Sequence, residues 1–163
     1  MSIVSVTTIK ALGIGHTNGT AALKFSGTGG VLLPNQPYVL ALSSTLSADR
    51  FISYSSLSVP FGSGDLINRG NHFNASTGIF TCPVDGMYLI AASYDNSTNV
   101  VERNIGHLWI NNVIQGEWVE SYGPYDNTSG MQLKRLNAND TIQIGVNTGL
   151  PFGFVVLQIY FLG

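Results

Sequence analysis

The chain has 163 residues, which is enough for one compact domain with a hydrophobic core and too few for two domains of ordinary size. Seven Lys and Arg against nine Asp and Glu give a formal net charge of −2, which excludes the basic patch of a generic nucleic-acid-binding protein. The hydrophobic fraction of 44% and the 19 Gly together exclude a disordered chain and a helical bundle rich in Ala, Glu, Lys and Leu. Because Ser, Thr and Asn are also abundant, the composition predicts a β-protein whose surface carries hydroxyl and amide groups.

The first 42 residues differ from the rest of the chain and are interpreted as an N-terminal extension. They mix turns rich in Gly and Thr with short apolar stretches such as Tyr38-Val39-Leu40. Pro34 and Pro37 restrict that stretch to a sheet edge or the entry of a loop, because Pro cannot donate a ladder hydrogen bond. We interpret residues 1–42 as a stalk, shoulder or anchor, and residues 43–163 as the folded domain. We expect no secretory signal and no membrane insertion, because neither a charged leader nor a run of about 18 apolar residues occurs.

From Ser43 onward, clusters of Gly, Asn, Asp, Pro and Ser separate short apolar runs, as is typical of a β-sandwich or barrel. Asn111-Asn112 lies between two of these runs and suits a two-residue hairpin turn, which needs positive φ. The fold class is therefore all-β, and the predicted strands fit a jelly roll, in which two antiparallel sheets close over one core. The predicted strands are Arg50–Ser58, Ile79–Thr81, Gly86–Tyr94, Ile105–Ile110, Val113–Glu120, Met131–Leu136, Thr141–Val146 and Phe154–Phe161.

The closing run Phe154–Leu162 is apolar on both faces, whereas a strand that is buried on one face should alternate. This pattern predicts two hydrophobic neighbours for the last strand. In a small sandwich we interpret the second neighbour as another subunit. The alternative is a central strand that a loop covers.

Three motifs follow one another along the chain. The first spans Phe73–Ile90 and includes Thr77-Gly78-Ile79-Phe80, Cys82-Pro83-Val84 and Gly86-Met87-Tyr88; the second is Gly130–Ile142, and the third is Phe152–Leu157. Together they resemble the globular domain of complement component 1q, a family structurally akin to tumour necrosis factor. The resemblance covers residues 45–163 and leaves residues 1–42 outside it.

The resemblance implies a jelly-roll homotrimer whose first and last strands lie near the three-fold axis. It implies that large side chains fill the core or the subunit junction, namely Phe80, Tyr88, Phe154, Ile159 and Phe161. Ile90 departs from the family pattern, which has an aromatic residue there. The region between Tyr94 and Gly130 has no matching residues, so the ligand and calcium contacts of relatives do not transfer to this chain.

The sequence contains no recognisable catalytic or cofactor motif, and we expect neither enzymatic activity nor a cofactor. The three histidines are far apart in sequence, and the single cysteine, Cys82, excludes an intramolecular disulfide framework. No His or Lys adjoins Cys82 to lower its pKa, so it is interpreted as a buried inert thiol. Glu117 and Glu120 are three apart on a predicted strand, which places them on opposite faces. Calcium is an alternative at Asp95-Asn96 or Asp126-Asn127, although solvated turns favour such residues anyway.

The stretch from Trp118 to Thr128 has the composition most typical of a binding site. Aromatic rings pack against the C–H face of a sugar, while carboxylates and amides bond to its hydroxyls. The candidate ligand-binding residues are Trp118, Glu120, Tyr122, Tyr125 and Asp126. The alternative is that Trp118 and Tyr122 belong to the core and only the turn is exposed.

These features favour a non-enzymatic homotrimer that acts as a recognition or attachment module on a particle surface. Such a module would be a virus or phage fibre, knob or spike, or a spore-coat domain, and avidity would hold it to a cell-surface glycan or protein receptor. Residues 1–42 would then contact other particle proteins, and no nucleic acid would be bound. One alternative is a secreted innate-immunity lectin for microbial glycans, with or without calcium. Another is a purely structural capsid decoration.

Overall fold

The computed structural model describes residues 14–15, 21–25, 31–32, 36–43, 45–47, 50–52, 67–95, 103–122, 126–146 and 154–163. The chain forms two compact units, Met1–Gln36 and Pro37–Gly163. The first unit holds a three-stranded antiparallel sheet of β1 (Ile14–Gly15), β2 (Ala21–Phe25) and β3 (Val31–Leu32). None of the described residues belongs to a helix long and apolar enough to cross a membrane.

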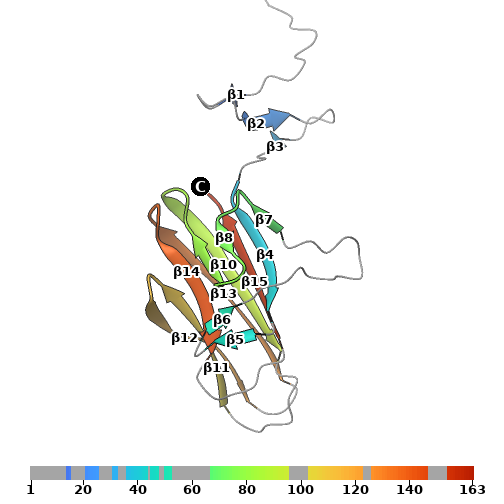
Figure 1. The fold of residues 1–163 in the computed structure, drawn as a ribbon, viewed down its shortest axis with the longest axis vertical. Coiled ribbons are helices and arrows are strands. Elements are labelled where there is room, and N and C mark those ends of the chain that lie inside the picture. Colours follow the sequence, from blue (N-terminus) through green and yellow to red (C-terminus); the bar gives the residue numbers. More distant parts are fainter. Residues whose placement is uncertain are drawn as a thin grey trace, which may run out of the picture. The chain divides into compact units, whose positions relative to one another are not determined.

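The second unit is a sandwich of two antiparallel sheets whose strands run along its length (Figure 1). The first sheet has the order β13 (Asn127–Leu136), β10 (Gly86–Asp95), β15 (Phe154–Phe161), β4 (Tyr38–Ser43) and β7 (Ile67–Arg69). The second sheet follows β12 (Val113–Tyr122), β11 (Arg103–Ile110), β14 (Thr141–Val146), β6 (Arg50–Ile52) and β5 (Thr45–Ser47). Beside β14 lie β9 (Ile79–Thr81) and then β8 (Phe73–Asn74). The predicted all-β sandwich is confirmed.

The boundary of the sandwich differs from the one that the sequence predicted at Ser43. The compact unit begins at Pro37, and β4 occupies a position inside the first sheet, between β15 and β7. Of the two predicted alternatives, a sheet edge and the entry of a loop, the edge is wrong. Pro37 directly precedes the first strand residue, so its missing N–H costs no ladder bond. The role of the preceding residues as stalk or anchor stays a prediction.

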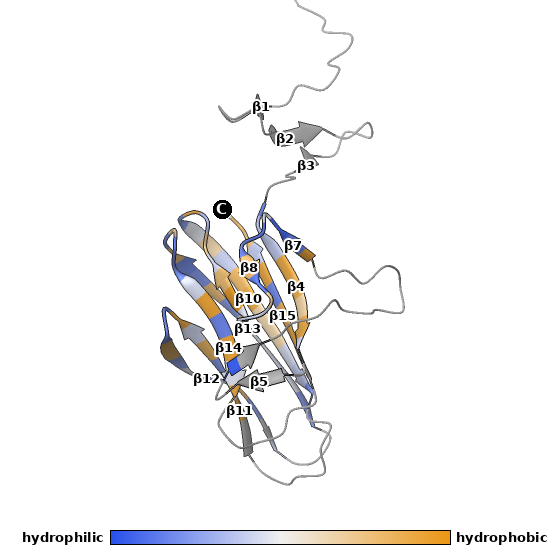
Figure 2. Cartoon of the chain, viewed as in Figure 1, coloured by the Kyte–Doolittle hydropathy of each residue, from blue (hydrophilic) through white to orange (hydrophobic). Residues whose placement is uncertain are grey.

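The core lies between the two sheets and follows the period of two that strands impose. Along β10 the buried positions are Tyr88, Ile90, Ala92 and Tyr94, although much of the strand has apolar colour in Figure 2, because residues on its other face are apolar too. Aromatic rings meet in this core: Phe80 packs edge-on against Tyr88 at 6.0 Å, and Phe161 lies 5.1 Å from Tyr88.

The predicted packing residues therefore divide between two environments. Phe80, Tyr88 and Ile159 are fully buried in the core of one chain, and Phe161 is half-buried against it. The side chain of Phe154 lies outside the described part of the structure. The buried residues thus belong to the core within one chain.

The hairpin turn predicted at Asn111-Asn112 is confirmed. Both residues have positive φ, 51° and 63°, which the mirror-image turns of tight hairpins require. The Asn111 amide fixes the turn to the next connection, because its Nδ2 donates to Asp140 Oδ1 at 2.8 Å and its Oδ1 accepts from the Thr141 N–H at 2.8 Å. The hydrogen bond from Asn111 Nδ2 and the one from the Asn137 N–H lower the pKa of Asp140.

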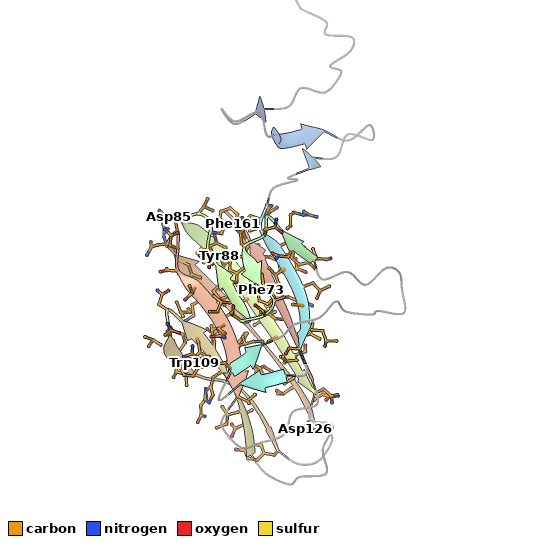
Figure 3. All side chains as sticks on the ribbon, in the orientation of Figure 1. Phe73, Asp85, Tyr88, Trp109, Asp126 and Phe161 are labelled. Atoms are coloured by element: carbon orange, nitrogen blue, oxygen red, sulfur yellow. The ribbon has the colours of Figure 1, made fainter. Side chains whose placement is uncertain are left out.

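The sandwich has two distinct ends. At the proximal end the chain enters at Pro37, whose carbonyl accepts from the Phe161 N–H, and Met87 N–H donates to the Gly163 carbonyl. At the distal end β10, β12 and β14 finish, and β11, β13 and β15 begin. In Figure 3 Asp126 marks the distal end, far from Asp85 and Phe161.

Candidate functional site

An exposed tyrosine lies between two carboxylates at the distal end of β12. The Tyr122 side chain is 66% exposed, and its hydroxyl donates a short hydrogen bond of 2.5 Å to Glu120 Oε1. Its backbone N–H donates to Asp126 Oδ2 at 3.0 Å. Glu120 and Tyr122 are two residues apart on one strand and so share a face. The structure therefore brings three of the predicted ligand residues together, and we name Glu120, Tyr122 and Asp126 the distal cluster.

The other two predicted ligand residues do not join this cluster. Tyr125 lies outside the described residues. Trp118 is half-buried against the core, and its indole Nε1 is buried without a hydrogen-bond partner in the described part of the chain. A Cβ on Gly130 would come within 2.9 Å of that nitrogen, so Trp118 reaches across from β12 to β13 and closes the gap between the sheets. The alternative that Trp118 and Tyr122 both belong to the core thus holds for Trp118, which packs against it, and not for Tyr122, which is exposed.

The two glutamates of β12 do not lie on opposite faces, as the sequence predicted. Glu120 stands opposite Ile105 and Glu117 opposite His107, and these partners are two apart on β11 and share a face. A bulge inserts one extra residue of β12 between the two pairs, which reverses the alternation beyond it. The bulge has no simple sequence signal, although Gly116 with φ of 93° lies beside it.

The described residues contain no group of three or more His, Cys, Asp or Glu that could hold a metal ion. Asp95 faces Asn127 across the ladder of the first sheet, and Asn96 lies outside the described range. Cys82 is fully buried, and burial together with the Asp140 charge raises the pKa of its thiol to about 12. A thiol with this pKa is neutral and unreactive at ordinary pH.

The outward face of the first sheet is a second candidate surface, which the sequence reasoning did not single out as a site. Here Met131 is 68% and Leu133 58% exposed, and the rings of Tyr38 and Tyr160 stack at 4.4 Å. Two rows cross the sheet in register: Leu133, Leu89, Tyr160, Tyr38 and Arg69, then Met131, Ala91, Gln158, Leu40 and Ile67. The next positions toward the distal end are polar, namely Ser93, Asp95 and Asn127. The signal was present in Tyr38–Ser43, which is apolar at both inward and outward positions, and in Met131-x-Leu133.

The two-sheet jelly roll, with an apolar outward face on one sheet, defines a class of small all-β binding domains. The sequence matches the C1q domain over residues 41–153, more than half of its length, and the chain therefore belongs to the C1q domain family. The fold is similar to the globular domain of zebrafish complement 1qA protein, with a TM-score of 0.55 and 18% identity over 78% of this chain and 98% of that one. It is also similar to murine APRIL, with a TM-score of 0.57 and 11% identity over 77% of this chain and 98% of that one. No curated protein sequence matches.

The predicted resemblance and fold class are thereby confirmed. Domains of the C1q and tumour necrosis factor type are typically trimeric recognition modules without enzymatic activity. Members of these families form homotrimers and bind receptors.

Proposed function

We propose that this chain is a homotrimeric recognition module, displayed on a particle surface such as a virus or phage fibre, that binds a cell-surface glycan or protein receptor through its distal end. The observation that carries the proposal is the apolar outward face of the first sheet. Soluble monomers rarely expose contiguous apolar patches larger than a few hundred Å². Five strands contribute to this face, so a second copy of the chain is its natural cover.

The shape of the outward face also favours contact with another copy. A hollow of about 420 Å³ lies over Ala91 and Ser93, between Met131 on one side and Val156 and Gln158 on the other. A side chain of a neighbouring subunit can fill such a hollow and gain the packing that an open surface lacks. This contact would also provide the second hydrophobic neighbour that the last strand was predicted to have.

The distal cluster supports receptor binding. Tyr122 presents an aromatic ring with little conformational entropy to lose, and the carboxylates beside it accept hydrogen bonds from hydroxyl or amine groups. Each single contact would be weak, but three copies on one trimer would bind a multivalent surface with a much higher combined affinity.

Light scattering on the intact chain tests the assembly. A homotrimer has a mass of about 52 kDa, three times 17.4 kDa. A mass of one chain would contradict the proposal, since both the cover of the apolar face and the avidity would be lost.

Binding of the trimer to a glycan array and to cells tests the recognition. Tyr122→Ala should abolish or strongly weaken binding while the mass stays trimeric. The matched control is Val113→Ala, which truncates a side chain that is 61% exposed at the other end of β12, and it should bind normally. Unchanged binding by Tyr122→Ala would place the contact elsewhere, and a trimer that binds nothing would favour the structural decoration protein. An antibody against the domain should label the surface of intact particles from the source organism.

A further inference from the structure

A third surface feature lies at the opposite edge of the second sheet from the distal cluster. The turn before β8 and the β8–β9 hairpin enclose an open depression of about 610 Å³, which is within the range usual for small-ligand sites. Its polar lining consists of Asn71, His72, Asn74, Thr77 and Thr81, and Ile79 contributes an apolar patch. None of these side chains is charged. The depression is therefore a neutral surface of amide, hydroxyl and imidazole groups around one aliphatic contact.

Several of these polar groups keep hydrogen-bonding capacity for a ligand. Asn74 Oδ1 is occupied by the Ser76 N–H at 3.0 Å and the Ser76 hydroxyl at 2.7 Å, which leaves its amide N–H₂ directed to no acceptor among the described residues. The Thr81 hydroxyl and the His72 ring likewise have no hydrogen bond within the described part of the chain. Burial lowers the pKa of His72, so at neutral pH its ring is uncharged and offers one donor and one acceptor.

Hydrogen bonds to the backbone hold the strands and the turn that surround the depression. Asn68 Nδ2 donates to the Phe73 carbonyl at 2.7 Å, and the Phe73 N–H donates to Asn68 Oδ1 at 3.1 Å. The Thr81 N–H donates to the His72 carbonyl at 2.8 Å, which fixes the two walls. Gly70, with φ of 88°, leaves the space in which the His72 ring lies, because a Cβ there would come within 2.5 Å of Nε2. A preformed site loses little entropy on binding.

We propose that this depression binds a neutral saccharide unit, with the aliphatic side chain of Ile79 against the C–H face of the sugar ring and its hydroxyls bonded to His72, Asn74 and Thr81. Sugar hydroxyls both donate and accept, as do the groups that line the site. A charged sugar would lose hydration without meeting an opposite charge, which disfavours it. The site is separate from the distal cluster and does not depend on the trimer.

Histidine ring resonances of the intact chain test this proposal, because the chain has only three histidines, His16, His72 and His107. The probes are neutral hexoses and N-acetylhexosamines, each compared with its uronic acid. We expect the His72 ring signal to shift and saturate at millimolar concentrations of a neutral sugar, roughly 1–10 mM, while His107 does not move. Thr81→Val keeps the shape of an exposed side chain and removes its hydroxyl, and should weaken binding roughly five-fold.

The matched control is Ser129→Ala, which removes an exposed hydroxyl from the first sheet and should bind like the unmodified chain. No shift of His72 at about 50 mM of any neutral sugar would overturn the proposal, since a millimolar site would then be nearly saturated. Equal shifts with the uronic acids would also overturn it, as would unchanged affinity in Thr81→Val. Loss of receptor binding at the distal cluster leaves this site unaffected, so the two proposals fail independently.

Discussion

The outward faces of the two sheets differ in the side chains that they carry and in how those side chains are paired. On the second sheet, Arg50 lies over the Trp109 ring at 4.1 Å and donates to Asn112 and Gln143, although the buried Trp109 Nε1 has no hydrogen-bond partner among the described residues. Gln143 in turn donates to the Thr77 carbonyl at 2.8 Å. On the first sheet, Leu133, Leu89 and the tyrosine pair offer apolar area with few polar partners. The difference supports the proposal that another copy of the chain covers the outward face of the first sheet.

The largest expected effect is a charge at the centre of the apolar face. Leu89→Arg should convert the proposed trimer to a monomer, because an unpaired cation cannot be buried in an apolar contact. Light scattering would show a three-fold loss of mass, with circular dichroism unchanged. Ile114→Arg places the same charge on the second sheet, where Ile114 is 41% exposed, and should leave the mass unaltered. Equal effects of the two variants would remove the distinction between the faces.

A smaller effect is expected at Gly130, where the two sheets meet. A Cβ at this position would lie 2.3 Å from Val119 Cγ1 and 2.9 Å from the Trp118 nitrogen. Gly130→Ala should therefore destabilise the fold by about 1–3 kcal/mol and change the tryptophan fluorescence, because Trp118 must move. Chemical denaturation measures the loss. Gly116→Ala is the comparison: it meets no neighbour but has φ of 93°, so a loss of about 1 kcal/mol without a change at Trp118 is expected.

The polar face can be tested through its central cation. Arg50→Ala removes the stacking on Trp109 and two hydrogen bonds, and should cost about 1–2 kcal/mol of unfolding free energy. Thermal unfolding gives the measurement. Arg69→Ala, at an exposed end of the apolar row, should change stability by less than about 0.5 kcal/mol. If Arg50→Ala left the free energy of unfolding unchanged, the outward face of the second sheet would not depend on this network.

The most gradual effect is expected from alkaline pH. Burial raises the pKa of Tyr88 and of Tyr38 to about 12, and the hydrogen bond with Tyr160 adds to the shift of Tyr38. The folded protein therefore holds protons that the unfolded chain releases near pH 10, so stability is constant below that pH and falls as pH rises toward 12. Tyrosinate absorbance follows the titration. Tyr160→Phe should lower the pKa of Tyr38 and leave that of Tyr88 unchanged, which separates the outward tyrosine from the core tyrosine.

The sequence predicted the elements whose signals are local. Ile79–Thr81, Thr141–Val146 and Phe154–Phe161 have the predicted bounds, and the Asn111-Asn112 turn has the predicted backbone. The start of β13 was missed, because Asn127-Thr128-Ser129-Gly130 has the composition of a turn. It is a strand because β10 offers ten residues to pair with, and Gly130 is required there by the indole of Trp118.

The candidate site was predictable only in part, because its geometry depends on pairing across the fold. Glu120 and Tyr122 were selected by composition, but the predicted strand ended at Glu120, whereas β12 continues to Tyr122 and so places both on one face. The position of Glu117 does not follow from alternation, since a bulge against β11 reverses the face on which it lies. The row of apolar side chains across five strands joins residues from Tyr38 to Tyr160, and only the order of the strands brings them together.

The closeness of Pro37 and Phe161 has a practical consequence for display of foreign sequences. Because the Phe161 N–H bonds to the Pro37 carbonyl, a protein fused after Gly163 would emerge beside the point where the chain enters the sandwich. Both attachment points are then remote from the connections at the far end of the strands. A peptide grafted between Tyr122 and Asp126 would be presented away from any support to which the termini are tethered, and a trimer would carry it in three copies.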